Sequence, residues 1–312
     1  MPEIVITEFM DAPSVAELER EFSVIYDPEL WSQPAKLLTL LPDCRGLVVR
    51  NRTQVRVNLL DAAARLRVVG RLGVGLDNID MAECAKRQVL VCPAIGANEV
   101  TVAEYVIASI IVLLRRGMFH RTGEVLAGSW PRMASRGSDA MGKCLGIVGF
   151  GGIGRAVAKR AHALGMNVVA YDPYVPADSD TWSECNVTCE ALTTLLEVSD
   201  VVTLHVPLTD QTRHIIDAAM LGKMKPGAML INTARGGVVD EQALVQALRD
   251  GRLGGAMIDV FEQEPVPANS MFVDVPNLHL TAHIAGYSDE SNARQGQIVA
   301  RRVREVLNGG AG

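Results

Sequence analysis

The sequence of 312 residues lacks the features that mark several classes of protein. It has no basic excess: 30 Lys and Arg stand against 36 Asp and Glu, and the net charge of -6 argues against nucleic acid as the main partner. Its six cysteines are scattered and no Cys/His group has zinc-site spacing, so we expect reduced thiols and no metal. The most apolar stretch, 105–114, is about half the length that a membrane-spanning helix needs. No basic segment precedes the first apolar run, so we expect no secretory signal and a cytoplasmic location.

What the sequence does have is an alternation of short apolar runs with helical patterns. The apolar runs are near-continuous, as in strands of a parallel sheet that is covered on both faces. In the first part of the chain, strands are predicted at 3–9, 44–50, 66–73 and 88–94, with helices at 14–22, 58–66 and 80–88. Ser14 stands where the N-cap of the first of these helices would lie.

The alternation is interrupted by a helix expected at about 98–116 and by a polar stretch, and it restarts at Leu145. From there, strands are predicted at 145–150, 166–172, 200–207, 227–234, 255–261 and 277–284. Six strands joined by crossovers predict a doubly wound sheet. The final segment, 289–310, is predicted to be one amphipathic helix that returns to complete the first domain.

A glycine-rich turn, LGIVGFGGIGRAVA at 145–158, follows the first strand of this second set and opens a helix. Gly149, Gly151 and Gly154 have the G-x-G-x-x-G spacing. The first permits a tight turn, the second lets a pyrophosphate approach the backbone, and the third lets the helix pack on the strand. The helix N-terminus then offers free N–H groups to the anion. Asp172 lies 18 residues after Gly154, where a carboxylate accepts ribose hydroxyls and repels a 2′-phosphate, which favours NAD over NADP.

These observations predict an α/β protein of two doubly wound domains. A Rossmann NAD-binding domain at 97–286 is inserted into a flavodoxin-like substrate domain formed by 1–96 plus 287–312. The insertion explains why a turn that usually opens a nucleotide-binding unit lies almost halfway along the chain.

Three predicted strands end in polar side chains that share one kind of chemistry. Arg235 follows one strand, Asp259, Glu262 and Glu264 follow the next, and His283 follows the last. Ligands bind outside the carboxyl ends of strands in such sheets. A guanidinium holds a carboxylate in a bidentate pair, an imidazole moves a proton near neutral pH, and a neighbouring carboxylate fixes the tautomer of that imidazole. Beside a nicotinamide, this set predicts a dehydrogenase that interconverts a 2-hydroxy acid and its 2-oxo acid.

Seven stretches in order resemble the D-isomer-specific 2-hydroxyacid dehydrogenases, which include phosphoglycerate, glycerate, D-lactate and hydroxypyruvate-type enzymes. They are GRLGVGLDNID, NEVTVAEYV, GKCLGIVGFGGIG, HVPLTDQTRHII, INTARGGVVDE, DVFEQEP and TAHIAG, from about residue 66 to 286. The resemblance is to phosphoglycerate dehydrogenase-like short forms without a regulatory domain. The sequence departs from the family at Gly152, where many relatives carry Arg, Asn or His. It departs again at Tyr287-Ser288, where most relatives have Ser-Thr.

The resemblance implies roles for individual residues. Arg235, Glu264 and His283 match the family's catalytic set, and Asp259 matches an Asp that the family places near the nicotinamide amide. In the oxo-acid reduction, His283 would protonate the developing alkoxide while Arg235 anchors the carboxylate.

The resemblance also implies binding residues and an assembly. The substrate carboxylate is expected on the backbone of Gly73, Val74 and Gly75. Cofactor contacts are implied for Gly149, Gly151, Gly152, Ile153, Gly154, Tyr171, Asp172, His205, Val206, Pro207, Thr212, Thr233, Ala234, Arg235, Asp259 and His283. The family is normally dimeric through the helix that contains 102–114, so we expect a homodimer.

The nature of the substrate is a separate hypothesis. Arg50, Asn51 and Arg52 follow a predicted strand, and the similar stretch contacts phosphate in phosphoglycerate dehydrogenases. We therefore expect a second anion on the substrate, as in 3-phosphoglycerate, sulfolactate or erythronate 4-phosphate. The alternatives are a glyoxylate/hydroxypyruvate reductase-type enzyme on a small oxo acid, an NAD-sensing corepressor-like binding protein, and a formate dehydrogenase, which has no use for an acid/base pair.

Overall fold

The computed structural model describes residues 2–116 and 121–309. The chain divides into two compact units, a first unit of Met1–Asn98 with Tyr287–Gly312 and a second unit of Glu99–Gly286. The division after Asn98 lies two residues beyond the domain boundary expected from the sequence. Each unit is a parallel sheet covered by helices on both faces, so the α/β, doubly wound fold class is confirmed.

The sheet of the first unit has five parallel strands in the order β2-β1-β3-β4-β5, the doubly wound order of flavodoxin-like sheets. Its strands are β1 Ile4–Ile6, β2 Val24–Tyr26, β3 Gly46–Val49, β4 Val68–Arg71 and β5 Leu90–Pro93. The strand β2 is absent from the sequence prediction because its three half-exposed residues give too short an apolar run.

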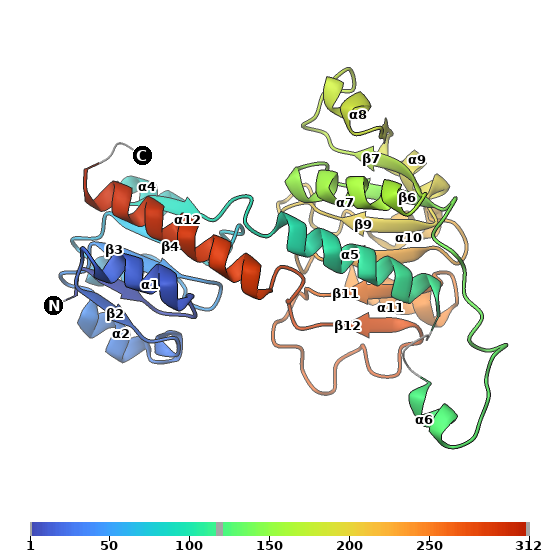
Figure 1. The fold of residues 1–312 in the computed structure, drawn as a ribbon, viewed down its shortest axis with the longest axis horizontal. Helices are drawn as coiled ribbons and strands as arrows, with labels where there is room; N and C mark the ends of the chain where they lie inside the picture. Colours follow the sequence, from blue (N-terminus) through green and yellow to red (C-terminus); the bar gives the residue numbers. More distant parts are fainter. Residues whose placement is uncertain (1, 117–120, 310–312) are drawn as a thin grey trace. The chain divides into compact units, whose positions relative to one another are not determined.

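Helices cover both faces of this first sheet. The helices α1 Ala12–Glu19 and α12 Asp289–Leu307 lie side by side, and α12 also packs on β3, β4 and β5 (Figure 1). The other core cluster of this unit draws on η1 Leu30–Ser32, α2 Pro34–Leu40, α3 Val57–Ala62 and α4 Met81–Lys86. A Cβ at Gly70 would lie 2.5 Å from Val299 Cγ1, so glycine in β4 is what allows α12 to pack this closely on the sheet.

The N-cap expected at Ser14 is wrong. The helix α1 starts at Ala12, and its N-cap is Asp11, whose carboxylate accepts the Ser14 N–H at 3.1 Å. Ser14 is buried inside the first turn. Pro13 fits in that turn because its missing N–H is one that has no partner within the helix.

The second unit has a seven-stranded parallel sheet in the order β12-β11-β10-β9-β6-β7-β8, the Rossmann order with one strand added. Its strands are β6 Cys144–Val148, β7 Asn167–Tyr171, β8 Thr188–Cys189, β9 Val201–Leu204, β10 Met229–Asn232, β11 Gly255–Ile258 and β12 Leu278–Leu280. The sequence predicts six of them, and the two-residue β8 is the one it misses. The topological switch lies between β6 and β9, which pair with each other although two strands separate them in sequence.

Two groups of helices enclose this sheet. The helices α5 Glu99–Leu114 and α7 Gly152–Ala163 pack on each other over one face. The helices α9 Leu192–Val198, α10 Ala218–Lys223 and α11 Glu241–Arg249 cover the other. The short helices α6 Thr122–Leu126 and α8 Asp180–Glu184 stand away from the layers of their own unit (Figure 1).

Among the helices of residues 2–116 and 121–309, none combines the length and apolar character needed to cross a bilayer. All six cysteines are free thiols. Within the same residues, no group of three or more His, Cys, Asp or Glu side chains is arranged to hold a metal ion.

Candidate active site

The expected cofactor and catalytic residues of the second unit all follow strands of its parallel sheet, at one edge. After β6 come Gly149 and Gly151–Gly154, after β7 Asp172, after β9 His205–Pro207 and Thr212, after β10 Thr233–Arg235, after β11 Asp259, and after β12 His283. Tyr171 is the last residue of β7. Because neighbouring strands are parallel and in register, their carboxyl ends share this edge, and the fold brings these residues to it.

The glycine turn has the geometry that a pyrophosphate requires. Gly149 has a φ of +94°, and a Cβ there would lie 2.5 Å from the carbonyl oxygen of His205. A Cβ on Gly154 would lie 2.4 Å from the carbonyl oxygen of Gly149, so this glycine lets α7 pack on the turn. At Gly151, the N-cap of α7, a Cβ would meet nothing within 4 Å among the described atoms, and no described side chain caps the helix. The first turn of α7 therefore offers N–H groups beside open space, which fits a dinucleotide phosphate.

Asp172 lies where the adenosine ribose of a dinucleotide would be recognised. Its Oδ2 accepts the Phe150 N–H at 2.8 Å and its Oδ1 accepts the Tyr174 N–H at 2.9 Å, which fixes the carboxylate against the glycine turn. Each oxygen keeps a further acceptor site for a hydroxyl. The departure at Gly152 also has a physical reason, because a Cβ there would lie 1.9 Å from Oε1 of Glu99. The carboxylate of Glu99 occupies the space that a larger residue 152 would take.

The loop after β9 lies beside the glycine turn, because β9 and β6 are the two strands on either side of the topological switch point. His205 is partly buried, and the desolvation of its ring lowers its pKa to about 3, so it is neutral at physiological pH. Its Nε2 lies 3.1 Å from Thr203 Oγ1. Thr212 Oγ1 accepts the Thr209 N–H at 2.7 Å and donates to the carbonyl of Pro207 at 2.5 Å, which holds the loop in one conformation.

The loops after β11 and β12 bring an imidazole and a carboxylate together. His283 Nδ1 and Glu264 Oε2 lie 2.9 Å apart, and the other oxygen of Glu264 accepts the Phe261 N–H at 3.0 Å. Burial alone would raise the pKa of Glu264. Hydrogen bonds from His283 and Phe261, together with the charges of His283 and Arg235, outweigh burial and hold this pKa below its usual value. The carboxylate therefore stays ionised and fixes the proton of His283 on Nδ1, which leaves Nε2 for a substrate.

Arg235 lies beside this pair on the turn after β10. The side chain of Asn232 braces the turn, since its Nδ2 donates to the Arg235 carbonyl at 3.0 Å and its Oδ1 accepts the Ala234 N–H at 3.0 Å. A Cβ on Gly236 would lie 1.9 Å from the carbonyl oxygen of Phe261, so only glycine allows the turn to approach the loop of Glu264. Thr233 Oγ1 is buried with no hydrogen-bond partner among the described residues, as expected of a group that awaits a ligand.

Asp259 is fully buried and organises the loop that carries His283. Its carboxylate accepts the Thr281 hydroxyl at 2.6 Å and the N–H groups of Ile284 and Ala285 at 2.8 Å each. Its carbonyl oxygen accepts the His283 N–H at 2.8 Å. These bonds hold His283 in a left-handed conformation, with a φ of +56°, which an ordinary residue rarely adopts.

Sequence reasoning missed two residues that support this loop. Tyr105, from α5, lies with its hydroxyl 2.5 Å from Thr281 Oγ1. Because the Thr281 hydroxyl donates to Asp259 Oδ1, Tyr105 is the donor of the pair, and burial raises the pKa of its hydroxyl and so keeps the proton in place. No local motif signals this contact, which joins positions 176 residues apart.

In the first unit, the residues expected to bind substrate follow β3 and β4. The guanidinium of Arg50 donates to Asn292 Oδ1 at 2.8 Å and lies 5.3 Å from the ring centroid of Tyr287. The guanidinium of Arg52 stacks over Trp31 at 4.4 Å. Tyr287, where the sequence departs from the family, is therefore a neighbour of Arg50.

The turn after β4 packs against the side chain of an arginine. Gly73 has a φ of +141°, and a Cβ there would lie 1.9 Å from Nη1 of Arg71. Val74 is 40% exposed, whereas Gly73 is buried. Arg71 itself is buried at the end of β4 and donates to the Leu72 carbonyl.

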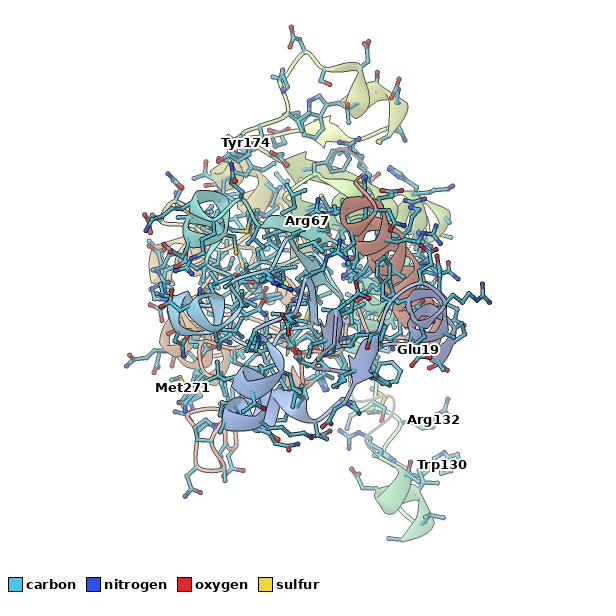
Figure 2. All side chains as sticks on the ribbon, turned by 90° about the vertical axis from the view of Figure 1, so that its left-hand side faces the viewer. Glu19, Arg67, Trp130, Arg132, Tyr174 and Met271 are labelled. Carbon is cyan, nitrogen blue, oxygen red and sulfur yellow. The ribbon has the colours of Figure 1, made fainter. Side chains whose placement is uncertain are left out.

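Other charged residues near these motifs lie outside the cluster. Glu262 pairs with His214 at 2.9 Å and does not contact His283. Arg155 donates to the carbonyl of Phe150 at 3.1 Å, and Arg132 lies on the exposed segment after α6 (Figure 2).

A Rossmann sheet with an open glycine turn, a carboxylate after its second strand and an Arg–Glu–His set at its strand ends is typical of an NAD-dependent oxidoreductase that moves a hydride and a proton. The chain belongs to the D-isomer-specific 2-hydroxyacid dehydrogenases. The model of the "D-isomer specific 2-hydroxyacid dehydrogenase, NAD binding domain" matches residues 107–285. NAD is the cofactor of this family.

Several known proteins are similar over nearly the whole chain. An (S)-sulfolactate dehydrogenase of Chromohalobacter salexigens is 52% identical over 307 residues, which cover 98% of this chain and 99% of the relative. A D-3-phosphoglycerate dehydrogenase of Methanocaldococcus jannaschii is 35% identical over 99% of this chain, which spans 58% of the length of that relative. The crystal structure of a D-lactate dehydrogenase from Aquifex aeolicus, complexed with NAD and lactic acid, matches with a TM-score of 0.84 and 28% identity over 98% of this chain and 96% of that one.

Proposed function

We propose that this enzyme oxidises a D-configured 2-hydroxy acid that carries a second anion, a sulfonate of the 3-sulfolactate type, with NAD. The observation that carries the reaction class is the 2.9 Å contact of His283 Nδ1 with Glu264 Oε2 at the strand edge that also holds the glycine turn. The catalytic set is Arg235, Glu264 and His283, the second unit binds NAD, and the first unit binds the substrate.

The reaction requires a proton acceptor, an anchor and a hydride acceptor. Bound NAD supplies the hydride acceptor for the hydrogen on C2. His283 Nε2 takes the hydroxyl proton as the C2–O bond becomes a carbonyl, and the imidazolium is stabilised by Glu264. Arg235 pairs with the C1 carboxylate. The side chain of His283 is 38% exposed, so the proton passes on to solvent. In the reverse direction, His283 donates the proton to the carbonyl oxygen.

The second anion is assigned to Arg50 and Arg52. Nε of Arg50 is buried with no hydrogen-bond partner among the described residues. A buried donor without a hydrogen bond is costly in free energy, so this atom favours binding of an anion. Stacking against Trp31 covers a face of the Arg52 guanidinium and leaves its in-plane N–H donors for a ligand. The similarity to a sulfolactate dehydrogenase supports a sulfonate as that ligand.

The stereochemistry is consistent with the family. In lactate the carboxylate outranks the methyl group, whereas in sulfolactate the sulfomethyl group outranks the carboxylate, because sulfur has priority over oxygen. The same spatial arrangement is therefore named R in D-lactate and S in sulfolactate. A relative named (S)-sulfolactate dehydrogenase agrees with a D-specific active site.

The test is a comparison of initial rates of NADH formation from 3-sulfolactate, 3-phosphoglycerate, D-glycerate and D-lactate. We expect the highest kcat/KM for 3-sulfolactate and a loss of that preference in Arg50→Ala. Equal kcat/KM for all four acids would instead favour a reductase of small oxo acids. Tight NADH binding without turnover of any acid would favour an NAD-sensing binding protein.

We also propose that the enzyme is a homodimer through α5. A shallow apolar depression between α5 and α7 is lined by Ile107, Ile111 and Val112, and Glu104 pairs with Arg160 at its rim. The segment after α6 adds Trp130, which is 74% exposed and stands apart in Figure 2. Such exposed apolar surface is typical of protein interfaces. Light scattering should give about twice the monomer mass of 33.6 kDa, and Ile111→Asp should halve it.

We propose a cytoplasmic location on the basis of the thiols. All six cysteines are unpaired, and burial raises the pKa of Cys44 to about 12, so that this group stays protonated. Free thiols at six positions fit a reducing compartment.

A further inference from the structure

The loop that carries Arg50 and Arg52 encloses a buried carboxylate that the proposed function does not use. Glu8 follows β1 and is 4% exposed. Its two oxygens accept the backbone N–H groups of four consecutive residues, Arg50 at 2.9 Å, Asn51 at 3.3 Å, Arg52 at 3.1 Å and Thr53 at 3.0 Å. Four successive N–H groups turned toward one point form a nest, a backbone arrangement that binds anions.

The opposite side of the same loop is held by an amide. Asn78, also 4% exposed, donates through Nδ2 to the carbonyl oxygens of Arg50 at 3.2 Å and Thr53 at 2.7 Å. The hydroxyls of Thr7 and Thr53 lie 2.7 Å apart beneath it. Buried side chains therefore bind both the donors and the acceptors of the loop backbone, which leaves it one conformation.

We propose that Glu8 is a positioning residue for substrate specificity: it fills the nest with the protein's own carboxylate and so fixes the loop that presents Arg50 and Arg52 to the second anion of the substrate. The inference rests on the proposed function. Because Glu8 occupies the backbone donors, the substrate anion is bound by guanidinium groups and not by the nest. Without the Glu8 carboxylate the loop would lose the four hydrogen bonds that fix its backbone. The free N–H groups of the nest would then compete with Arg50 and Arg52 for the substrate anion.

The side chains around the loop explain why a shift of its backbone would affect binding of the second anion in particular. Arg50 is held by Asn292 and lies near the rings of Phe9 and Tyr287, and burial lowers its pKa without neutralising it. A shift of the loop backbone would remove the guanidinium from these contacts. Binding of the second anion should therefore depend on Glu8, whereas NAD binding and the chemistry on C2 should not.

The experiment measures kcat/KM for 3-sulfolactate and for D-lactate, which lacks the sulfonate, in the wild type, Glu8→Gln, Glu8→Ala and Asn78→Ala. We expect the ratio of the two values to fall about tenfold or more in each variant, through KM for 3-sulfolactate, with KM for NAD and for D-lactate unchanged. The matched control is Glu3→Gln, because Glu3 also accepts a backbone N–H, from Ser23 at 3.2 Å, and pairs with Arg45 in the same unit. Its ratio should remain that of the wild type.

Acetate provides a second, independent readout. In Glu8→Ala the nest is vacated, and added acetate should restore part of the lost ratio, whereas it should not raise the ratio in the wild type. If the wild type prefers 3-sulfolactate and both Glu8→Ala and Asn78→Ala keep the full preference, the role of Glu8 is overturned. The proposed function is then left intact. A wild type without that preference would overturn both. A Glu8 variant that loses turnover of D-lactate equally, with no response to acetate, would show a purely structural role.

Discussion

Replacing Glu264 by Gln tests the acid/base pair with the smallest change of shape. The amide oxygen of Gln can still accept the Phe261 N–H, but its NH2 group would face His283 Nδ1, which lies 2.9 Å from the carboxylate in the wild type. A hydrogen bond to a charged group contributes about 1.5–3 kcal/mol. Since about 1.4 kcal/mol corresponds to a factor of ten in rate, kcat/KM should fall about 10- to 150-fold.

The assay is the initial rate of NADH formation from 3-sulfolactate across a pH series. Because the pKa of Glu264 lies below its usual value of 4.5, the ionised pair persists as pH falls through 4.5, and its contribution to stability is lost only at lower pH. Glu264→Gln has no carboxylate at this position, so urea unfolding of this variant should show no such loss of stability in acid. The matched control is Glu262→Gln, which lies on the same loop but pairs with His214. Equal kcat/KM in Glu264→Gln and Glu262→Gln would refute the role of the pair.

Three further outcomes follow from the second unit. Asp172→Ala should raise KM for NAD about tenfold, because an acceptor for the ribose hydroxyls is lost. It should also reduce the preference for NAD over NADP, because the charge that repels the 2′-phosphate is lost. Steady-state kinetics with both dinucleotides would measure these changes, and an unchanged preference would contradict the prediction. Gly149→Ala should destabilise the protein by about 1–3 kcal/mol or more, because φ is +94° and the new Cβ would lie 2.5 Å from the His205 carbonyl; a melting temperature equal to that of the wild type would contradict this. Because burial lowers the pKa of His205 to about 3, its unfolded form binds a proton from about pH 6.5 downward while the folded form does not, so stability should fall as pH decreases over this range and should fall less in His205→Gln, as measured by urea unfolding.

The parts of the fold that were predictable from sequence depend on local signals. Near-continuous apolar runs marked all the strands of four or more residues, and the glycine spacing marked the switch point. The short strands β2 and β8 gave no such run. The cap at Asp11 was missed because Ser14, three residues later, offers an equally good capping side chain in sequence, and only the start of α1 decides between them.

In the candidate site too, residues with a local sequence signal were predictable and long-range contacts were not. Arg235, Glu264 and His283 are each adjacent to a strong strand pattern, so their positions at the strand ends were predictable from the order of the strands. The contacts of Glu8 and Tyr105 were not, because each joins segments far apart in the chain, 42 to 45 residues for Glu8 and 176 for Tyr105. Glu8 falls inside the strand predicted at 3–9 and had no predicted role, whereas β1 ends at Ile6 and Glu8 is buried just beyond it.

The most direct measurement of the central claim compares kcat for 3-sulfolactate oxidation by the wild type and by His283→Asn. Asparagine tolerates the left-handed conformation of residue 283, with its φ of +56°, so the substitution removes the proton acceptor without straining the loop. The account predicts a loss of about 100- to 10,000-fold in kcat with NAD affinity unchanged. Turnover by His283→Asn at the wild-type rate would contradict it.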